Sequence, residues 1–141
     1  MYTHLITNKK NLLYLTNKTY SNFFILKHNN QKYLFTDPRY SHAKNENQDF
    51  KVIIIEDTKK DIQEFLKNKK IKEILFDPND ITVEKLKNFK KIFKRIKFKA
   101  QKKDPSFLNR QIKKPNEIRL LKKSQEINEK IYLEIRKELT I

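Results

Sequence analysis

The sequence of 141 residues contains no cysteine and no glycine, and each absence excludes a class of functional site. Without cysteine there are no disulfides, no zinc-finger or iron–sulfur ligation and no thiol nucleophile. Without glycine there is no glycine-rich loop to cradle a phosphate. The longest apolar runs, residues 23–26 and 52–55, are far below the roughly 20 residues that cross a bilayer, and the first residues lack a signal-peptide pattern. We therefore expect a cytoplasmic protein with no membrane partner.

Charge, in contrast, is plentiful and mostly of one sign. The sequence has 33 Lys and Arg against 17 Asp and Glu, a net charge of +16, and residues 67–103 alone carry 14 basic and 4 acidic side chains. Only five of the basic residues are Arg, whereas base and phosphate recognition favours the guanidinium fork. The pattern favours a solvated basic face over a nucleic-acid partner, and a free-standing basic nucleic-acid-binding module is kept as the alternative function.

Apolar runs alternate with amphipathic segments along the chain. Strands are expected over residues 2–6, 23–28, 32–36, 50–55, 74–76 and 96–99. Helices are expected over residues 38–45, 58–69, 82–93 and 115–139, and a short helical or turn segment over residues 8–15. Asn29 and Asn30 separate two strands and can form a tight hairpin turn, because Asn tolerates positive φ. The alternation predicts an α/β fold, a mixed sheet of about six strands with helices on both faces.

Local patterns predict how these helices begin and which side chains they bury. Thr58 and Thr82 are expected to cap the helices that follow them. The short helix near the start should bring Leu12, Leu13 and Leu15 inward, and Val83 should join the buried face of its helix.

The last helix is expected to begin at Pro115 and to run to about residue 139, longer than a domain of this size needs. An apolar stripe at intervals of three and four follows one face: Leu120, Ser124, Ile127, Ile131, Ile135 and Leu139. Its far end, at Ile131, Ile135 and Leu139, is predicted to pack on a partner. We therefore divide the chain into a domain over residues 1–103 and a hinge with a protruding helix over residues 104–141.

No catalytic or metal-binding constellation is visible in the sequence. His4, His28 and His42 are scattered over different elements without carboxylates at ligand spacing, so exposed or turn histidines are favoured over a metal site. Asp37, Arg39 and Tyr40 share one predicted turn. Two interpretations stay open for them: a local structural turn, or a contact with a substrate cleft or a neighbouring subunit.

Four segments carry a resemblance to a known family. They are Leu-Ile-Thr-Asn at residues 5–8, Asn-Leu-Leu-Tyr-Leu-Thr-Asn at 11–17, Tyr-Leu-Phe-Thr-Asp-Pro-Arg-Tyr at 33–40 and Arg-Gln-Ile-Lys-Lys-Pro-Asn-Glu-Ile at 110–118. In this order they resemble the N-terminal domain of the creatinase, prolidase and Xaa-Pro aminopeptidase family, with the Xaa-Pro aminopeptidases most similar. The sequence departs from the family where Asn17, Tyr20 and Pro38 replace glycines and Lys114 replaces a capping serine. A positive φ at those glycine positions would strain a residue with a Cβ.

The resemblance implies a non-catalytic N-terminal domain. It implies that such a domain contributes subunit contacts, as in a homodimer, and one wall of the substrate cleft of a metallopeptidase. The two divalent metals implied for the family belong to a catalytic domain that these 141 residues do not include. We therefore expect no enzymatic activity, no cofactor and no metal in this chain itself, and its own catalytic domain and a second subunit as partners.

Overall fold

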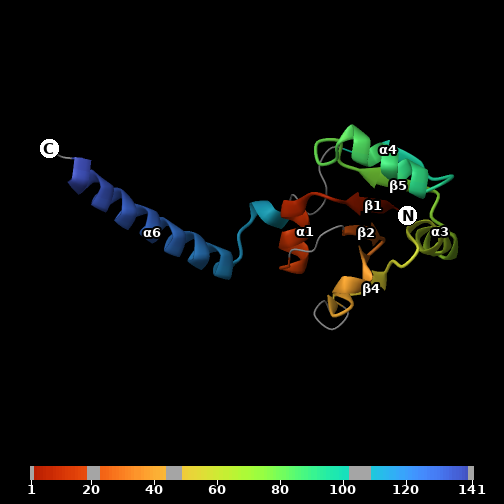
Figure 1. Ribbon diagram of the computed structural model, residues 1–141, viewed down its shortest axis with the longest axis horizontal. Helices are drawn as coiled ribbons and strands as arrows, with labels where there is room; N and C mark the ends of the chain where they lie inside the picture. Colours follow the sequence, from red (N-terminus) through yellow and green to blue (C-terminus); the bar gives the residue numbers. More distant parts are fainter. Residues whose placement is uncertain (1, 19–22, 44–48, 102–108, 140–141) are drawn as a thin grey trace. The chain divides into compact units, whose positions relative to one another are not determined.

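The computed structural model describes residues 2–18, 23–43, 49–101 and 109–139, which fall into two units, residues 1–108 and 109–141 (Figure 1). The first unit contains the sheet, and the second contains the long last helix. The domain boundary predicted at residues 103 and 104 lies outside the described residues. No described helix is both long enough and apolar enough to cross a membrane.

The sheet of the first unit has six strands: β1 (Thr3–Ile6), β2 (Phe24–His28), β3 (Gln31–Thr36), β4 (Phe50–Ile54), β5 (Glu73–Phe76) and β6 (Lys97–Ala100). Their order across the sheet is β4-β3-β2-β1-β5-β6. The neighbours β1, β2 and β3 are antiparallel, whereas β4 pairs in parallel with β3, and β5 in parallel with both β1 and β6. The predicted mixed sheet of six strands is confirmed.

Two asparagines provide the left-handed backbone that glycine would otherwise supply. Asn29, in the hairpin turn between the paired residues His28 and Gln31, has φ 53°. Asn17 ends α1 (Lys9–Thr16) with φ 54° and donates its backbone N–H to the carbonyl of Leu13. Asn is among the residues that tolerate this region best. Residue 17 therefore keeps a positive φ at a glycine position of the family.

The remaining helices of the first unit are η1 (Pro38–Tyr40, a 3-10 helix), α3 (Thr58–Asn68) and α4 (Val83–Ile92). Thr82 caps α4 as predicted, because its hydroxyl accepts the Lys85 N–H. The prediction that Thr58 caps α3 is wrong. Asp57 is the cap, and its carboxylate accepts the N–H groups of Lys59 and Lys60 at 3.0 and 3.1 Å. A carboxylate is favoured there because it also faces the positive end of the helix dipole.

Apolar side chains cover both faces of the sheet, as predicted. A larger cluster joins the strands to α3 and α4, and its buried members are Leu5, Phe24, Leu26, Tyr33, Phe35, Ile62, Phe65, Leu66, Ile71, Ile74, Phe89 and Phe93. A smaller cluster joins the other face to α1, through Ile6, Leu12, Ile25, Leu34, Ala43 and Phe50. The predictions that Leu13 and Val83 are buried are wrong, because their side chains are 45% and 71% exposed.

The connection from β3 to β4 also differs from its prediction. In place of one helix over residues 38–45, the described part contains the 3-10 helix η1, then a turn at Ser41 and His42, and then a helical residue at Ala43. Residues 44 and 45 lie outside the described residues. Asp37 starts η1 by accepting the Arg39 N–H, and the short turn leaves Arg39 at the surface.

The second unit is dominated by α6 (Pro115–Leu139), whose bounds match the prediction. Lys114 supplies no serine hydroxyl at its start, but the Glu117 carboxylate accepts the Lys114 N–H at 2.8 Å. This is the returning half of a capping box, so the helix start retains one of its two reciprocal bonds.

The hydroxyl of Thr36 is an unsatisfied buried group. Thr36 is fully buried at the end of β3, and its Oγ1 has no hydrogen-bond partner among the described residues. Replacing Thr36 with Val keeps the branched shape and removes the unpaired hydroxyl, so we expect Thr36→Val to raise the free energy of unfolding by about 1 kcal/mol. Urea unfolding followed by circular dichroism measures the change, with Thr36→Ser as the control that retains the hydroxyl. A loss of stability in Thr36→Val would mean that the hydroxyl is bonded in solution.

Candidate functional site

The turn after β3 holds the three candidate residues Asp37, Arg39 and Tyr40 together. The Arg39 guanidinium binds the Asp37 carboxylate through two contacts, Nε to Oδ1 at 3.0 Å and Nη2 to Oδ2 at 2.7 Å. This paired geometry is the strong form of an ion pair. The Arg39 hydrogen bond holds the pKa of Asp37 below its ordinary value. The carboxylate and the guanidinium therefore form one preorganised, exposed polar unit.

Tyr40 anchors that unit to the domain. Its side chain packs against the smaller apolar cluster, and the Arg39 Cζ lies 5.7 Å from the centre of its ring. The Arg39 side chain itself remains 68% exposed. The bonds of Asp37 support a local structural role for this turn. The guanidinium of Arg39 is still exposed enough to contact a partner, so both interpretations of the turn stay open.

The apolar stripe of α6 is exposed along its whole length. None of the residues of α6 is buried, and Ile131, Ile135 and Leu139 are 49, 50 and 76% exposed. Isolated exposed apolar residues are common, whereas a continuous exposed apolar stripe is typical of interaction surfaces. The predicted stripe is therefore present on α6, and no other part of the second unit that the structure describes buries it.

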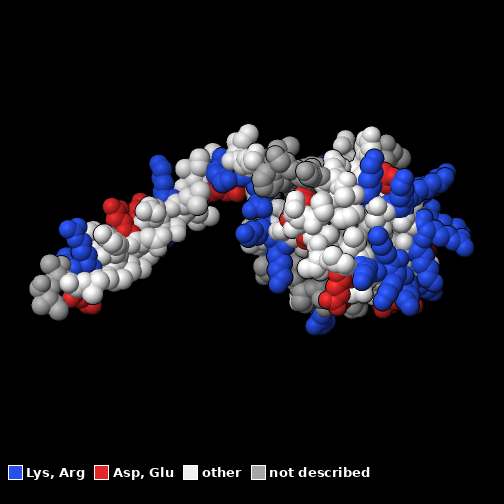
Figure 2. Space-filling model, turned by 90° about the horizontal axis from the view of Figure 1, so that it is seen from above, with Lys and Arg blue, Asp and Glu red and all other residues white. Residues whose placement is uncertain are grey.

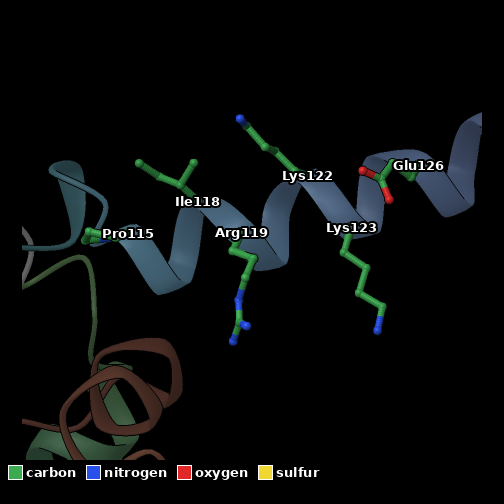
Figure 3. Close-up of a pocket in the computed structure, with 6 residues that line it drawn as sticks. All are labelled: Pro115, Ile118, Arg119, Lys122, Lys123 and Glu126. Carbon is green, nitrogen blue, oxygen red and sulfur yellow. The ribbon is translucent and has the colours of Figure 1, made fainter.

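A hollow of about 480 Å³ lies against the first turns of α6 (Figure 3). Its lining residues all belong to this one helix: Pro115, Ile118, Arg119, Lys122, Lys123 and Glu126. Ile118 and Lys122 point to one side of the helix, and Arg119 and Lys123 point to the other (Figure 3). Because these side chains diverge, they do not converge on a bound molecule and do not form a small-molecule site.

The three histidines lie on different elements of the first unit, but the expectation that they are exposed or turn residues is wrong for His28, which is buried on β2. His4 is half-buried on β1, and His42 is exposed after η1. Among the residues that the structure describes, no three His, Asp or Glu side chains come together as metal ligands. The described residues therefore offer no fit for the divalent metals that the resemblance implies for the family.

His28 makes the stability of the first unit depend on pH. Its Nδ1 lies 2.8 Å from the Thr3 hydroxyl, and burial, with Lys69 nearby, lowers the pKa of His28 from its ordinary 6.5. The folded state therefore binds fewer protons than the unfolded state between the two pKa values. Stability is fully present above about pH 6.5 and should fall as the pH drops from there towards the folded pKa.

Chemical denaturation of the chain at several pH values between about 7.5 and 5 tests this dependence. In the His28→Gln variant, the free energy of unfolding should depend less steeply on pH, because the contribution of His28 is removed. Asn30→Gln, at an exposed position without a titratable group, is the control and should keep the wild-type slope. An unchanged slope in His28→Gln would contradict the assigned cause.

One polar junction was not anticipated from the sequence. The Asp80 carboxylate accepts the side-chain amides of Asn8 and Asn11, from Nδ2 of each to Oδ1 at 2.9 Å and Oδ2 at 3.1 Å. These bonds tie the start of α1 to the loop after β5, across 72 and 69 residues of sequence. The only local signal was a turn at residues 77–80, which carries no information about a distant partner.

Comparison with known proteins identifies the domain. Residues 3–104 match the family model described as the Creatinase/Prolidase N-terminal domain. A search of curated proteins found no match.

Solved structures agree with the family model. The X-Pro aminopeptidase of Thermotoga maritima is 26% identical with a TM-score of 0.76, and the match covers 99% of this chain and 41% of that one. The aminopeptidase P of Streptococcus thermophilus is 29% identical with a TM-score of 0.60, covering 70% of this chain and 77% of that one. The Xaa-Pro dipeptidase of Bacillus anthracis shares the fold, at 19% identity and a TM-score of 0.83, over 97% of this chain and 39% of that one.

The chain thus spans about two-fifths of the Thermotoga and Bacillus proteins. The match to the family model includes the hairpin, the parallel strands and the Asp37 turn, in the same region as most of the motifs that suggested the resemblance. The chain belongs to the creatinase/prolidase N-terminal domain family.

Proposed function

We propose that this chain acts as the non-catalytic N-terminal part of an Xaa-Pro aminopeptidase or dipeptidase, a metal-dependent enzyme that cleaves the bond before proline. The observation that carries the proposal is the match of nearly the whole chain, at 26% identity, to an X-Pro aminopeptidase of which it covers only 41%. In this proposal the chemistry, including any divalent metals, resides in a catalytic domain beyond the matched region.

Two surfaces serve that role in the proposal. The exposed stripe of α6 packs against the catalytic domain, because burial of an apolar stripe is what stabilises such a contact. The Asp37–Arg39 unit faces the substrate cleft or a second subunit of a homodimer, because an exposed guanidinium fixed by one carboxylate can still donate to another.

A cytoplasmic location belongs to the proposal too, supported by one relative of the same fold that is described as a cytoplasmic peptidase of Mycobacterium tuberculosis.

The isolated chain should show no peptidase activity. Its described carboxylates and histidines form no metal cage, and metal-assisted hydrolysis requires one. Hydrolysis of Xaa-Pro dipeptides and tripeptides is measured with manganese, cobalt or zinc added. Turnover that is abolished by a chelator and persists through stringent purification would contradict the non-catalytic role.

A chimera tests the role of the Asp37 turn. Residues 1–141 replace the matching part of the Thermotoga X-Pro aminopeptidase, and the kinetics of tripeptide cleavage are measured. In the chimera, Arg39→Ala should change KM or the dimer population, because the guanidinium is proposed to contact substrate or the second subunit. Arg39→Lys keeps the charge but loses the paired geometry and should recover only part of the function.

A matched control is a surface cation with no proposed role, such as Lys59→Ala at the start of α3. It should leave both KM and the dimer population unchanged. If Arg39→Ala behaves like Lys59→Ala in both measurements, the turn is purely structural and the cleft or subunit role is wrong.

A further inference from the structure

Cationic side chains gather at the end of the first unit where α3 and α4 terminate. The last turn of α3 and the loop after it carry Lys67, Lys69, Lys70 and Lys72, and the loop after α4 and the first residue of β6 carry Lys94, Arg95 and Lys97, with no carboxylate within either stretch. Figure 2 shows Lys and Arg side chains gathered over the side of the first unit on which α3, α4 and the N-terminus lie in Figure 1. We call these seven residues the basic end.

Backbone hydrogen bonds hold the two loops side by side. The Lys97 N–H donates to the Lys72 carbonyl at 3.0 Å, and β5 and β6 begin in parallel with Glu73 opposite Lys97. The hairpin turn between β2 and β3 lies at the same end of the strands, because the Asn29 N–H donates to the Tyr2 carbonyl and Thr3 of β1 pairs with His28. The starts of β1, β5 and β6 and the turn between β2 and β3 therefore lie at the same end of the sheet.

The basic end includes a hollow of about 540 Å³. Its lining contains no carboxylate and is rich in amide and ammonium donors: His28, Asn29, Asn30, Gln31, Tyr33, Asn68, Lys69 and Lys70. The Lys69 ammonium lies 5.5 Å from the centre of the Tyr33 ring, which holds it at the wall of the hollow. In this lining the pKa of His28 is lowered mainly by burial and secondly by the positive charge of Lys69.

Helix termini explain part of this charge but not its whole extent. Cations at the C-terminal end of a helix stabilise the helix dipole, which accounts for lysines next to the last turns of α3 and α4. Lys97 is instead the first residue of β6, and Lys72 directly precedes β5. Among the described residues, Lys97 is the one member of the basic end with an ion pair, to Glu73 at 4.0 Å, so most of the charge there is not neutralised within the domain.

We propose that the basic end binds the phosphate backbone of nucleic acid. Six of its seven cations are lysines, which act as point charges on phosphates and do not offer the bidentate geometry that reads bases. Binding is therefore non-specific for sequence and strongly dependent on salt, with Kd on the order of 10⁻⁴ to 10⁻⁶ M at physiological salt.

The scarcity of exposed apolar side chains near the hairpin turn favours nucleic acid over a membrane surface as the partner of the basic end. Membrane-surface binding combines basic residues with an apolar face that enters the acyl region. Beside the hairpin turn, Tyr2 is the exposed large apolar side chain, at 67% exposure, whereas Tyr33 is buried. A single exposed aromatic ring can stack on a base but does not form an apolar face.

The experiment compares two triple variants of equal net charge. Lys67→Glu with Lys72→Glu and Lys94→Glu alters the basic end, and Lys10→Glu with Lys59→Glu and Lys60→Glu alters exposed lysines at the starts of α1 and α3. Fluorescence anisotropy measures binding of a labelled oligouridylate of about 20 nucleotides, a length that exceeds common single-strand site sizes. Titrations at about 50 and 150 mM salt give the salt dependence.

We expect the basic-end variant to lose about tenfold or more in affinity and to reduce the slope of log K against log salt by about 0.7 per lost phosphate contact. The matched variant should stay within about twofold of the wild type at constant salt. Circular dichroism confirms folding, and the corresponding Lys→Gln set should give an intermediate loss.

Three results would overturn the proposal. Equal losses in the two triple variants would mean that only total charge matters. Absence of binding by the wild type at low salt would remove the site altogether. Binding to anionic phospholipid vesicles or polyglutamate as tight as that to the oligonucleotide would assign the surface to a membrane or to an acidic protein. None of these outcomes depends on peptidase activity, so the proposal stands apart from the proposed function.

Discussion

Replacing Phe35 with alanine should lower the free energy of unfolding by about 3–5 kcal/mol, because it empties the centre of the larger core cluster. Phe35 is fully buried on β3. Its ring is stacked at 4.7 Å on Phe24 and lies edge-on at 5.0 Å to Phe65, so β2 and α3 both lose their contact with it. Since small domains are stable by only about 5–15 kcal/mol, this change removes a large share of the total.

Urea unfolding followed by circular dichroism measures the loss. Phe35→Leu, which refills much of the volume, should recover part of it, and Val83→Ala at an exposed position should change stability by less than about 0.5 kcal/mol. A Phe35→Ala variant as stable as the wild type would show that the larger core cluster is not packed as described.

The second large effect concerns the stripe of α6. In the isolated chain this stripe has no cover from its own unit, so the chain should either dimerise through Ile131, Ile135 and Leu139 or fray beyond about Tyr132. The double substitution Ile131→Lys and Ile135→Lys separates the outcomes. We expect sedimentation to show a monomer with an otherwise intact first unit.

The matched control makes the same change of +2 in net charge on the polar face of the helix, through Glu126→Gln and Glu129→Gln. It should leave the association state of the wild type unchanged. If Ile131→Lys with Ile135→Lys unfolds the whole chain, these two residues belong to the core of the first unit and the stripe is not a partner surface.

Local sequence signals predicted the elements whose causes are local. Asn29 marked the hairpin turn because few other residues accept its φ, and Thr82 marked the start of α4 because its hydroxyl has one nearby donor to satisfy. The regular apolar intervals of α6 predicted the bounds of a helix that no tertiary contact has to define.

The errors arise where two local candidates compete or where tertiary contacts decide. Asp57 and Thr58 are adjacent good caps, and the sequence does not show which of them has extended backbone. Leu13 fits the helical spacing of α1, but that short helix faces the smaller cluster mainly through Leu12. The amides of Asn8 and Asn11 that bind Asp80 are brought together only by the parallel pairing of β1 with β5.

The candidate site was predicted less completely than the fold, for the same reason. The sequence placed Asp37, Arg39 and Tyr40 on one turn, but not the two-contact ion pair or the exposed outer edge of the guanidinium. The charge count over residues 67–103 likewise indicated a basic face, whereas its concentration at one end requires the parallel alignment of β5 and β6.

The most direct test of the proposed function is the cleavage rate of an Xaa-Pro tripeptide by the chimera that joins residues 1–141 to the remainder of the Thermotoga X-Pro aminopeptidase. If this chain is the N-terminal part of such an enzyme, the folded chimera should cleave the peptide in the presence of divalent metal, and Ile131→Lys with Ile135→Lys should reduce the rate by about tenfold or more, since loss of about 1.4 kcal/mol suffices for that factor. A folded, metal-loaded chimera with no turnover, or one that is indifferent to the double substitution, would contradict the proposed role.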